Sequence, residues 1–315
     1  MKLIRNINNL KFQTNSCILT IGNFDGVHLG HQKLLNIVCK KKKEHNKPII
    51  VTIFEPYPLE FFCSENPPVR LMNFREKIQY LSQWNIDAIL CIYFNKSFSS
   101  LSPMNFITNI MVKKLNVFFL AVGKNFCFGS NRQGNTILLK SIGKHYKFSV
   151  HTTKILKINE IEVSSTAIRQ ALKNNNLKLA KMLLGRSFSM SGKVTYGKKN
   201  GTKIGFPTAN IELNKNNSPI YGVFIVKVFI LSLKRMFFGV ANIGTQPTMN
   251  GKTQKLEVHL IDSSLNLYKQ YIKVIFIKKI RDEIFFTSIK NLKEQIMCDI
   301  SKARLHFNNQ IHKKL

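Results

Sequence analysis

The sequence predicts an α/β domain with a doubly wound parallel sheet, followed by a smaller antiparallel β-barrel domain that ends in a helix. Its first half alternates apolar runs with amphipathic segments, which is typical of parallel βαβ units. After Gly185 the apolar runs are β-rich and separated by glycines, as in barrels and sandwiches. The length of 315 residues also exceeds what one hydrophobic core usually fills. We therefore expect two domains, at residues 1–185 and 186–315.

In the first domain, the strand-like runs are apolar throughout, because helices cover both faces of a parallel sheet. We expect strands at residues 17–21, 48–54, 88–94, 117–122 and 148–153. The helical spacing of apolar side chains between these runs predicts the connecting helices. The expected helices cover residues 28–41, 74–84, 103–114 and 135–145, and two shorter ones follow at residues 165–173 and 177–184.

In the second domain, short runs separated by turns predict antiparallel strands. We expect them at residues 189–196, 222–229, 236–243, 255–260 and 272–277. An amphipathic stretch at residues 292–307 predicts the closing helix. The change of pattern near residue 185 sets the expected domain boundary.

The net charge of +32 and the pI near 10.1 resemble those of proteins that bind nucleic acid. The basic residues are spread along the chain, however, and only nine of the 48 are arginines. Asparagine and isoleucine are also abundant, as drift in an AT-rich genome would produce. We therefore expect no nucleic-acid partner. A basic RNA-binding protein is the alternative outside the enzymes.

No apolar run is long enough to cross a membrane, and the strongest, residues 221–233, contains Lys227. The N-terminus lacks the continuous apolar segment of a secretion signal. Six scattered cysteines without a CxxC pair favour free thiols over zinc ligands or disulfides. These observations predict a cytoplasmic protein without a membrane partner, and they leave the oligomeric state open.

The most specific segment is GNFDGVHLGH at residues 22–31, directly after the first apolar run. Its glycines allow a ligand to approach the backbone, and His28 and His31 share one side of a helix start. The first turn of a helix attracts anions, so the segment predicts a phosphate site. Two alternatives are a histidine pair without a ligand, and two members of a metal site whose other ligands are not apparent.

HLGH resembles the H-x-G-H signature of the nucleotidylyltransferase superfamily, and the longer segment is similar to that of bacterial bifunctional riboflavin kinase/FAD synthetases. Further segments resemble this family in the same order. They are FEPYPLEFF (54–62), RLMNFREKIQYL (70–81), VGKNFCFG (122–129) and VSSTAIRQAL (163–172). The resemblance implies a nucleotidylyltransferase-like fold and the transfer of AMP from ATP to FMN, with release of pyrophosphate.

Direct adenylyl transfer needs no protein nucleophile, so positioning and charge stabilisation carry the catalysis. The resemblance implies that His28, His31 and Arg169 are the catalytic residues of this domain. It implies an ATP site formed by Gly22, Asn23, Asp25, Gly26, His28, Gly30, His31, Ser165, Thr166 and Arg169. We expect Ser165 to cap its helix and Arg169 to bind phosphate bidentately; a solvated helix residue is the alternative for Arg169.

For the flavin of this domain, the resemblance implies contacts with Phe54, Pro56, Asn125, Phe126 and Phe128. Phe126 and Phe128 alternate around a strand end, so packing in the core is the alternative for them. Three residues depart from the family pattern: Asn125 where aspartate is frequent, Cys127 where arginine is common, and Tyr57 where histidine is frequent.

The second domain contains GKVTYGKKNGTKIGFPTANI at residues 192–211, which resembles the G-F-P-T-A-N motif of riboflavin kinases. NIGTQPT (242–248), LEVHL (256–260) and KKIRDEIFF (278–286) follow in family order. The resemblance implies phosphorylation of riboflavin by ATP. It assigns nucleotide binding to Gly192, Lys193, Gly197, Gly205, Phe206, Pro207, Thr208 and Asn210, and Mg²⁺ binding to the oxygen atoms of Thr208 and Asn210.

By the same resemblance, Glu257 takes the proton of the riboflavin 5′-hydroxyl, and Glu257 and Arg281 contact the flavin. Glu257 lies in an alternating strand, so Lys255 and His259 share its face. An exposed strand carboxylate is the alternative for Glu257.

Two positions of the second domain depart from the family pattern. Thr202 replaces the arginine of the glycine loop, with Lys203 beside it, and Gln246 replaces a residue that is often basic. We still expect kinase activity, with weaker phosphate contacts. The sequence thus predicts a two-domain enzyme of flavin cofactor biosynthesis that uses riboflavin, FMN and ATP with Mg²⁺. Among enzymes, the alternative is a chain that retains only one of the two activities.

Overall fold

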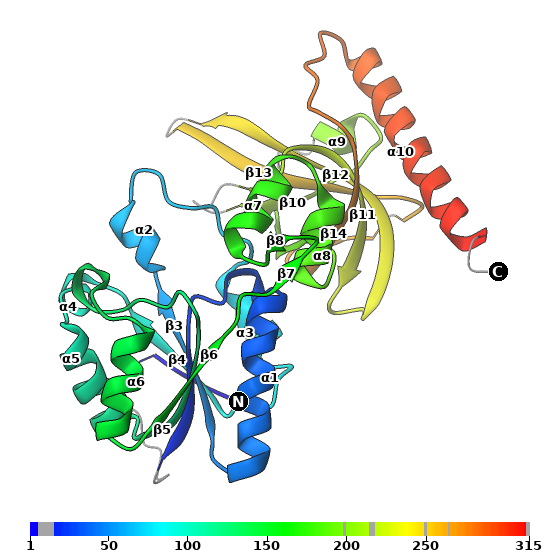
Figure 1. Ribbon diagram of the computed structural model, residues 1–315. Coiled ribbons are helices and arrows are strands. Elements are labelled where there is room, and N and C mark those ends of the chain that lie inside the picture. Colours follow the sequence, from blue (N-terminus) through cyan, green and yellow to red (C-terminus); the bar gives the residue numbers. More distant parts are fainter. Residues whose placement is uncertain (6–15, 198–199, 214–217, 249–250, 264, 313–315) are drawn as a thin grey trace. The chain divides into compact units, whose positions relative to one another are not determined.

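The protein is described by a computed structural model that covers residues 1–5, 16–197, 200–213, 218–248, 251–263 and 265–312. It contains two compact units (Figure 1). The N-terminal unit consists of Met1–Pro68 and Phe74–Ser165, and the C-terminal unit consists of Val69–Asn73 and Thr166–Leu315. The domain boundary at residue 185 stays a prediction. Among the described residues, no helix combines the length and the apolar character that a membrane span requires.

The N-terminal unit contains a six-stranded parallel sheet, as the sequence predicts. Its strands are β1 Lys2–Ile4, β2 Cys17–Ile21, β3 Ile49–Glu55, β4 Ala88–Tyr93, β5 Val117–Gly123 and β6 Ser149–Thr153. Their order across the sheet is β1-β4-β3-β2-β5-β6. The chain therefore winds from β2 through β3 to β4 in one direction and continues with β5 and β6 on the other side of β2. This reversal of winding lies between β2 and β5.

Helices cover both faces of this sheet, with α1 on one side and α5 and α6 on the other (Figure 1). The helices are α1 Leu29–His45, α2 Pro58–Phe62, α3 Phe74–Leu81, α4 Lys96–Ser99, α5 Pro103–Asn105, the π-helix η3 Phe106–Lys114 and α6 Thr136–His145, and the 3₁₀ turns are η2 Asp25–Val27 and η4 Ser130–Arg132. A small antiparallel hairpin pairs β7 Lys157–Ile158 with β8 Ile161–Glu162. Ile107, Met111 and Leu139 pack against Leu19 and Leu120 of the sheet and form a continuous core.

The C-terminal unit begins with α7 Ser165–Lys173, whose first residue belongs to the N-terminal unit, and α8 Leu177–Leu184, both at their predicted bounds. A closed antiparallel barrel follows, in the order β10-β13-β12-β11-β14-β9. Its strands are β9 Ser189–Thr195, β10 Ala209–Glu212, β11 Gly222–Ile230, β12 Arg235–Thr248, β13 Gly251–Leu260 and β14 Tyr271–Arg281, and its helices are α9 Asn200–Lys203 and α10 Ile289–His312. The predicted barrel with a closing helix is confirmed.

The barrel interior is filled by alternate residues of each strand. On β13, Leu256 and Val258 are buried inside the barrel, so Glu257 between them faces outward. Helix α10 packs on the outside, where its Ala303 and Phe307 join the barrel residue Ile225 in one apolar cluster. The helix thus turns one outer face of the barrel into a partly covered surface.

Candidate active sites

The first site lies at the carboxyl ends of β2 and β5, where the winding of the parallel sheet reverses. Residues 22–31 follow β2 and residues 124–129 follow β5, and these two strands are neighbours in the sheet. In open α/β sheets, ligands bind outside the carboxyl ends of the strands at this switch point. The strand order therefore brings together two segments that are separated by 92 residues in sequence.

The backbone after β2 forms an unusual turn. Phe24, Gly26 and Val27 have φ values of 49°, 80° and 37°, all in the left-handed region. This conformation is strained for a β-branched residue such as Val27, and strained turns persist only where the surroundings hold them. The Ser165 hydroxyl donates to the Asp25 carbonyl at 2.9 Å, and the Gln32 side-chain amide donates to the Val27 carbonyl at 3.0 Å.

The turn delivers His28 to the N-cap of the 17-residue helix α1. Its Nδ1 accepts a hydrogen bond from the backbone N–H of His31 at 3.3 Å, so in the neutral ring Nε2 carries the proton. The His28 and His31 rings stack with their centroids 3.6 Å apart. A Cβ on Gly30 would lie 3.1 Å from the His28 ring and 3.3 Å from the Val163 carbonyl. Gly30 therefore permits the packing that places both imidazoles over the helix start.

The predicted flavin residues of this unit divide into core and surface. Phe128 is 8% exposed and packs against Phe106, with 5.4 Å between ring centroids, so it belongs to the core. Phe126 is half-buried and stacks on Phe128 at 5.7 Å, whereas Asn125 is exposed. Phe54, near the end of β3, is half-buried and packs against Phe94, with 5.8 Å between the ring centroids. Two residues later, a cis peptide bond joins Glu55 to Pro56.

The later part of the predicted ATP site lies on α7. We expected Ser165 to cap this helix. In the structure it is the first helical residue, and its hydroxyl donates to the Asp25 carbonyl rather than capping the helix backbone. Thr166 and Arg169 belong to the C-terminal unit. Arg169 is half-buried and its Nε donates to the Val69 carbonyl at 2.6 Å, which does not fit a solvated helix residue.

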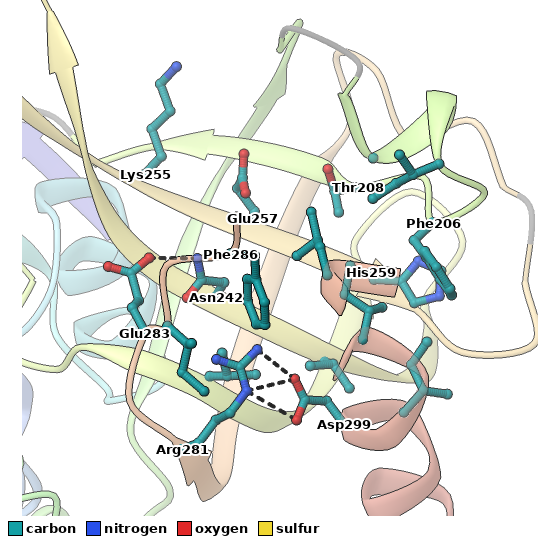
Figure 2. A pocket seen from close by; sticks show the side chains of 18 of the residues that line it. Phe206, Thr208, Asn242, Lys255, Glu257, His259, Arg281, Glu283, Phe286 and Asp299 are labelled. Carbon is teal, nitrogen blue, oxygen red and sulfur yellow. Dashed lines mark hydrogen bonds and ion pairs between the residues drawn. The ribbon is translucent and has the colours of Figure 1, made fainter. Parts of the chain in front are cut away.

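The second site is a pocket between the outer face of the barrel and α10 (Figure 2). Of the predicted residues, it brings together Phe206, Thr208, Asn210, Glu257 and Arg281. Its other lining residues are Gly201, Ile204, Val223, Val240, Asn242, Lys255, His259, Glu283, Ile284, Phe286, Leu292, Ile296, Asp299 and Ile300. Polar groups from the strands thus face apolar groups from α10, as in a site for an amphipathic ligand.

Three polar side chains form a row across the strands of the barrel. Glu257 on β13 is directly opposite Asn210 on β10 and Asn242 on β12. Directly opposite residues of antiparallel strands point to the same face, so both carboxamides flank the carboxylate. Burial raises the pKa of Glu257 above its usual value; Lys255 acts in the opposite direction, and the Glu283 carboxylate adds to the rise. A raised pKa makes this carboxylate a stronger base than an exposed glutamate.

The glycines around the pocket are explained by close contacts or, at Gly205, by a positive φ. A Cβ on Gly197 would lie 2.5 Å from the Asn210 carboxamide nitrogen, and one on Gly201 would overlap the Phe206 carbonyl. Gly205 has a φ of 90°, and Gly192 lies against Ile211 without space for a side chain. Of the predicted nucleotide residues, those outside the pocket lining are Gly192, Lys193, Gly197, Gly205 and Pro207.

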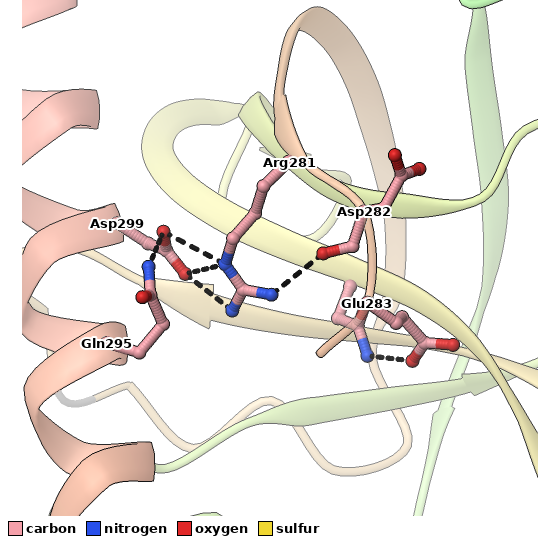
Figure 3. A network of polar contacts seen from close by, with 6 residues as sticks. Arg281, Asp282, Glu283, Gln295 and Asp299 are labelled. Carbon is pink, nitrogen blue, oxygen red and sulfur yellow. Dashed lines mark hydrogen bonds and ion pairs between the residues drawn. The ribbon is translucent and has the colours of Figure 1, made fainter. Parts of the chain in front are cut away.

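Arg281 is held by a network that reaches α10 (Figure 3). Its Nε and Nη2 donate to the Asp299 carboxylate at 3.0 and 2.8 Å, and its Nη1 donates to the Asp282 carbonyl at 2.9 Å. Gln295 donates to the same carboxylate at 3.0 Å, and Asp299 is only 2% exposed. The guanidinium is therefore fixed at the wall of the pocket rather than free to swing.

The structure adds Asn242, His259, Glu283 and Asp299 to the residues that sequence reasoning identified. Asn242 donates to Glu283 at 2.9 Å, and the His259 ring contacts the Pro207 carbonyl at 2.8 Å. The first three lie inside segments that carry the family resemblance, which was the available signal. Asp299 lies in an amphipathic helix and carries no motif.

Comparisons with known proteins match each unit to a family. Residues 10–167 match the family model for FAD synthetase, and residues 184–307 match the model for riboflavin kinase. A bifunctional riboflavin kinase/FMN adenylyltransferase of Buchnera aphidicola subsp. Schizaphis graminum is 50% identical over 98% of this chain and 99% of its own length. The protein of the same description from Escherichia coli strain K12 is 46% identical over 98% of each chain.

A solved structure resembles nearly the whole chain. It is a crystal structure described as that of a macrolide-efflux protein from Streptococcus pneumoniae. Its TM-score is 0.81 at 26% sequence identity, and the match covers 96% of this chain and 98% of that one. The combination of a parallel-sheet unit with a barrel unit therefore recurs in an experimentally determined structure.

Proposed function

Because the chain belongs to the family of bifunctional riboflavin kinases/FMN adenylyltransferases, we propose which of its residues carry each of the two activities. The enzyme phosphorylates riboflavin with ATP to give FMN, and it transfers AMP from ATP to FMN to give FAD and pyrophosphate. The observation that carries the assignment is that the barrel contains a pocket lined by the riboflavin kinase segments, while the parallel sheet brings residues 22–31 and 124–129 of the FAD synthetase segments to its switch point. We assign the first reaction to the barrel pocket and the second to the switch-point site.

In the kinase reaction, Glu257 accepts the proton of the riboflavin 5′-hydroxyl while that oxygen attacks the γ-phosphorus of ATP and ADP leaves. Its partly buried position supports this role, because burial raises its pKa and makes it a stronger base. Asn210 and Asn242 flank the carboxylate across the strands and orient the groups that bind there. Arg281, fixed by Asp299, forms the flavin-side wall of the pocket.

Thr208 and Asn210 fit a magnesium site. Both line the pocket, and both offer neutral oxygen atoms of the kind that Mg²⁺ takes in addition to phosphate oxygens and water. Mg²⁺, when bound, neutralises charge on the phosphates of ATP. Among the described residues there is no cluster of three or more His, Cys, Asp or Glu side chains able to hold a metal by itself. A site shared with nucleotide phosphates is therefore the form that we propose.

In the adenylyltransferase reaction, a phosphate oxygen of FMN attacks the α-phosphorus of ATP, and the bond to pyrophosphate breaks. We assign charge stabilisation to His28 and His31, whose rings stand at the start of α1, where the positive end of the helix dipole favours anions. The family resemblance of residues 163–172 supports Arg169 and Thr166 as further phosphate contacts. Exposed Asn125 and half-buried Phe126 are the proposed flavin contacts.

We place the enzyme in the cytoplasm, where ATP and free thiols are found; the free state of all six cysteines supports this. We propose no nucleic-acid partner. If the positive charge served RNA binding instead, RNA affinity would be steeply salt-dependent and would survive the replacement of Glu257.

The assignment is tested by following products from riboflavin, ATP and Mg²⁺ by chromatography. The purified full-length protein should accumulate FMN and then FAD. His28→Ala should abolish FAD formation and spare FMN, whereas Glu257→Gln should slow FMN formation by about 10²- to 10⁴-fold and leave FAD formation from added FMN intact. If either variant impaired both steps equally, the separation into two sites would be wrong.

A further inference from the structure

Helix α3 carries a lysine that is completely buried, although it lies in neither group of predicted site residues. Lys77 is 0% exposed, and its neighbour Glu76 is 3% exposed. Moving a charged group out of water is costly, so a lysine in this position has partners that repay the cost. The location of those partners indicates what the lysine does.

Lys77 lies over an aromatic ring that points to the adenylyltransferase site. Its Nζ is 4.1 Å from the centroid of the Tyr57 ring. The Tyr57 hydroxyl in turn donates to Oδ1 of Asp25 at 3.2 Å. Tyr57 and Asp25 are each 2% exposed, so these contacts are formed away from water. A continuous path therefore runs from α3 through Tyr57 to the turn η2.

The contact of Lys77 with Tyr57 and the hydrogen bond of Tyr57 to Asp25 strengthen one another. A cation over the face of an aromatic ring is attracted by the electrons of the ring, most strongly when water is excluded. The positive charge also draws electron density from the ring, which makes the phenol hydroxyl a better hydrogen-bond donor to a carboxylate. Lys77 thus holds Tyr57 in place and reinforces the hydrogen bond to Asp25.

Asp25 lies inside the strained turn that precedes His28. Phe24, Gly26 and Val27 on either side of it all have φ values in the left-handed region. The turn is held at the Asp25 carbonyl by Ser165, at the Val27 carbonyl by Gln32 and at the Asp25 side chain by Tyr57. A turn of this kind changes conformation when such contacts are lost.

We propose that Lys77 is a positioning residue for adenylyl transfer. Acting through Tyr57 and Asp25, it fixes the turn η2 and so sets the positions of His28 and His31 at the phosphates. This inference rests on the proposed function of the N-terminal unit and adds to it a residue that does not touch the substrate. Tyr57 gains a role of its own here, because it links Lys77 to Asp25 at a position where the family often has histidine.

The test uses the full-length enzyme with four variants: Lys77→Met, Tyr57→Phe, the double variant, and Lys42→Met as a control. Lys42 forms an ion pair with Asp87 at 2.7 Å in the same unit and has no contact with η2 in the described structure, so its loss reports on stability alone. FAD formation from FMN and ATP is measured below the unfolding transition of every variant, with kcat and the KM for ATP determined separately.

We expect Lys77→Met to lower kcat by about 10- to 100-fold, with a smaller change in the KM for ATP, because misplacement of groups acts mainly on the transition state. Tyr57→Phe keeps the ring and removes only the hydroxyl, so it should lower kcat less. The double variant should be no worse than Lys77→Met, since both changes interrupt one path. FMN formation by the barrel should be unchanged in all four variants.

A wild-type kcat in Lys77→Met, with only the lowered stability that Lys42→Met also shows, would overturn the proposal. If Lys77→Met does not fold, Tyr57→Phe decides, and a wild-type kcat in that variant overturns the proposal equally. Additive losses in the double variant would do the same. Failure of the underlying assignment is separable, because His28→Ala would then leave FAD formation intact.

Discussion

The two sites differ in what holds their functional groups. In the N-terminal unit, the histidines are placed by a strained backbone turn and a helix start at the end of a parallel sheet. In the barrel, Glu257 and its two asparagine neighbours are placed by cross-strand register on an outer face. A parallel sheet offers ligands its loops, whereas a barrel offers rows of side chains. We therefore expect substitutions near the turn to act through the backbone, and substitutions in the barrel to act one side chain at a time.

The largest expected effect is on the free energy of unfolding, when the Arg281–Asp299 ion pair is broken. Asp299→Asn removes the charge opposite a largely buried guanidinium, and breaking such a pair costs about 3–5 kcal/mol. Denaturant unfolding should show this loss. Asp262→Asn breaks the exposed pair between Arg304 of the same helix and Asp262 of the turn after β13, and it should cost less than about 1 kcal/mol. Equal losses in the two variants would show that α10 is not anchored through Asp299.

The next largest effect is expected in the row of Asn210, Glu257 and Asn242 across the barrel strands. In Gly197→Ala, the added methyl group would meet the Asn210 carboxamide at 2.5 Å and displace it. We expect FMN formation to slow by about 10²-fold, because a displacement of this size disturbs reactive geometry. Gly123→Ala at the end of β5 is the control, since a Cβ there meets nothing within 4 Å. A Gly197→Ala enzyme with normal FMN formation would contradict the placement of Asn210 in the kinase site.

A smaller effect is expected from Ser165→Ala, which removes one hydrogen bond to the strained turn. We expect a loss of about 1 kcal/mol in stability, together with slower FAD formation and unchanged FMN formation. Ser99→Ala removes a hydroxyl that donates to the Lys96 carbonyl within one exposed helical turn, and it should leave both rates unchanged. A decrease in FMN formation without a decrease in FAD formation would contradict the assignment of Ser165 to the adenylyltransferase site.

The finest difference is in pH dependence. The base form of Glu257 is needed for FMN formation, so the rate should fall as the pH decreases through its raised pKa. Glu283→Gln removes an influence that raises this pKa, so the acid limb should move to lower pH; Lys255→Met should move it to higher pH. The pH profile of kcat/KM for riboflavin measures both shifts. Opposite shifts, or the same shifts in FAD formation, would contradict the role of Glu257.

The sequence was sufficient for features that depend on local pattern. The helices at residues 165–173 and 177–184 were predicted at their bounds because their apolar side chains repeat with a helical period, and β2 was predicted at its bounds because it is a continuous apolar run with clear ends. Strand β10 was not predicted, since its four residues, 209–212, begin inside the G-F-P-T-A-N motif and are too few to show alternation. Strand β1, three residues long, was missed for the same reason.

Features that depend on contacts between distant parts of the chain could not be predicted from the sequence. The order of strands decides that the segments after β2 and β5 meet, and no local pattern encodes that order. The contact of Asp299 with Arg281 joins a helix to a strand end, and no local sequence pattern around either residue predicts that they pair. Phe128 illustrates a third case. Its motif suggested a ligand contact, but its burial places it in the core.

The short segment Val69–Asn73 forms its contacts with residues that are synthesised much later. Its Val69 carbonyl accepts from Arg169, 100 residues later, and Asn73 donates to the Ser191 carbonyl, 118 residues later. The chain consequently passes from one unit to the other three times, after Pro68, after Asn73 and after Ser165. On a ribosome, the segment emerges long before its partners, and α3 begins at the very next residue. The C-terminal unit is therefore built from two separate stretches of the chain, and no single cut in the gene would release both units whole.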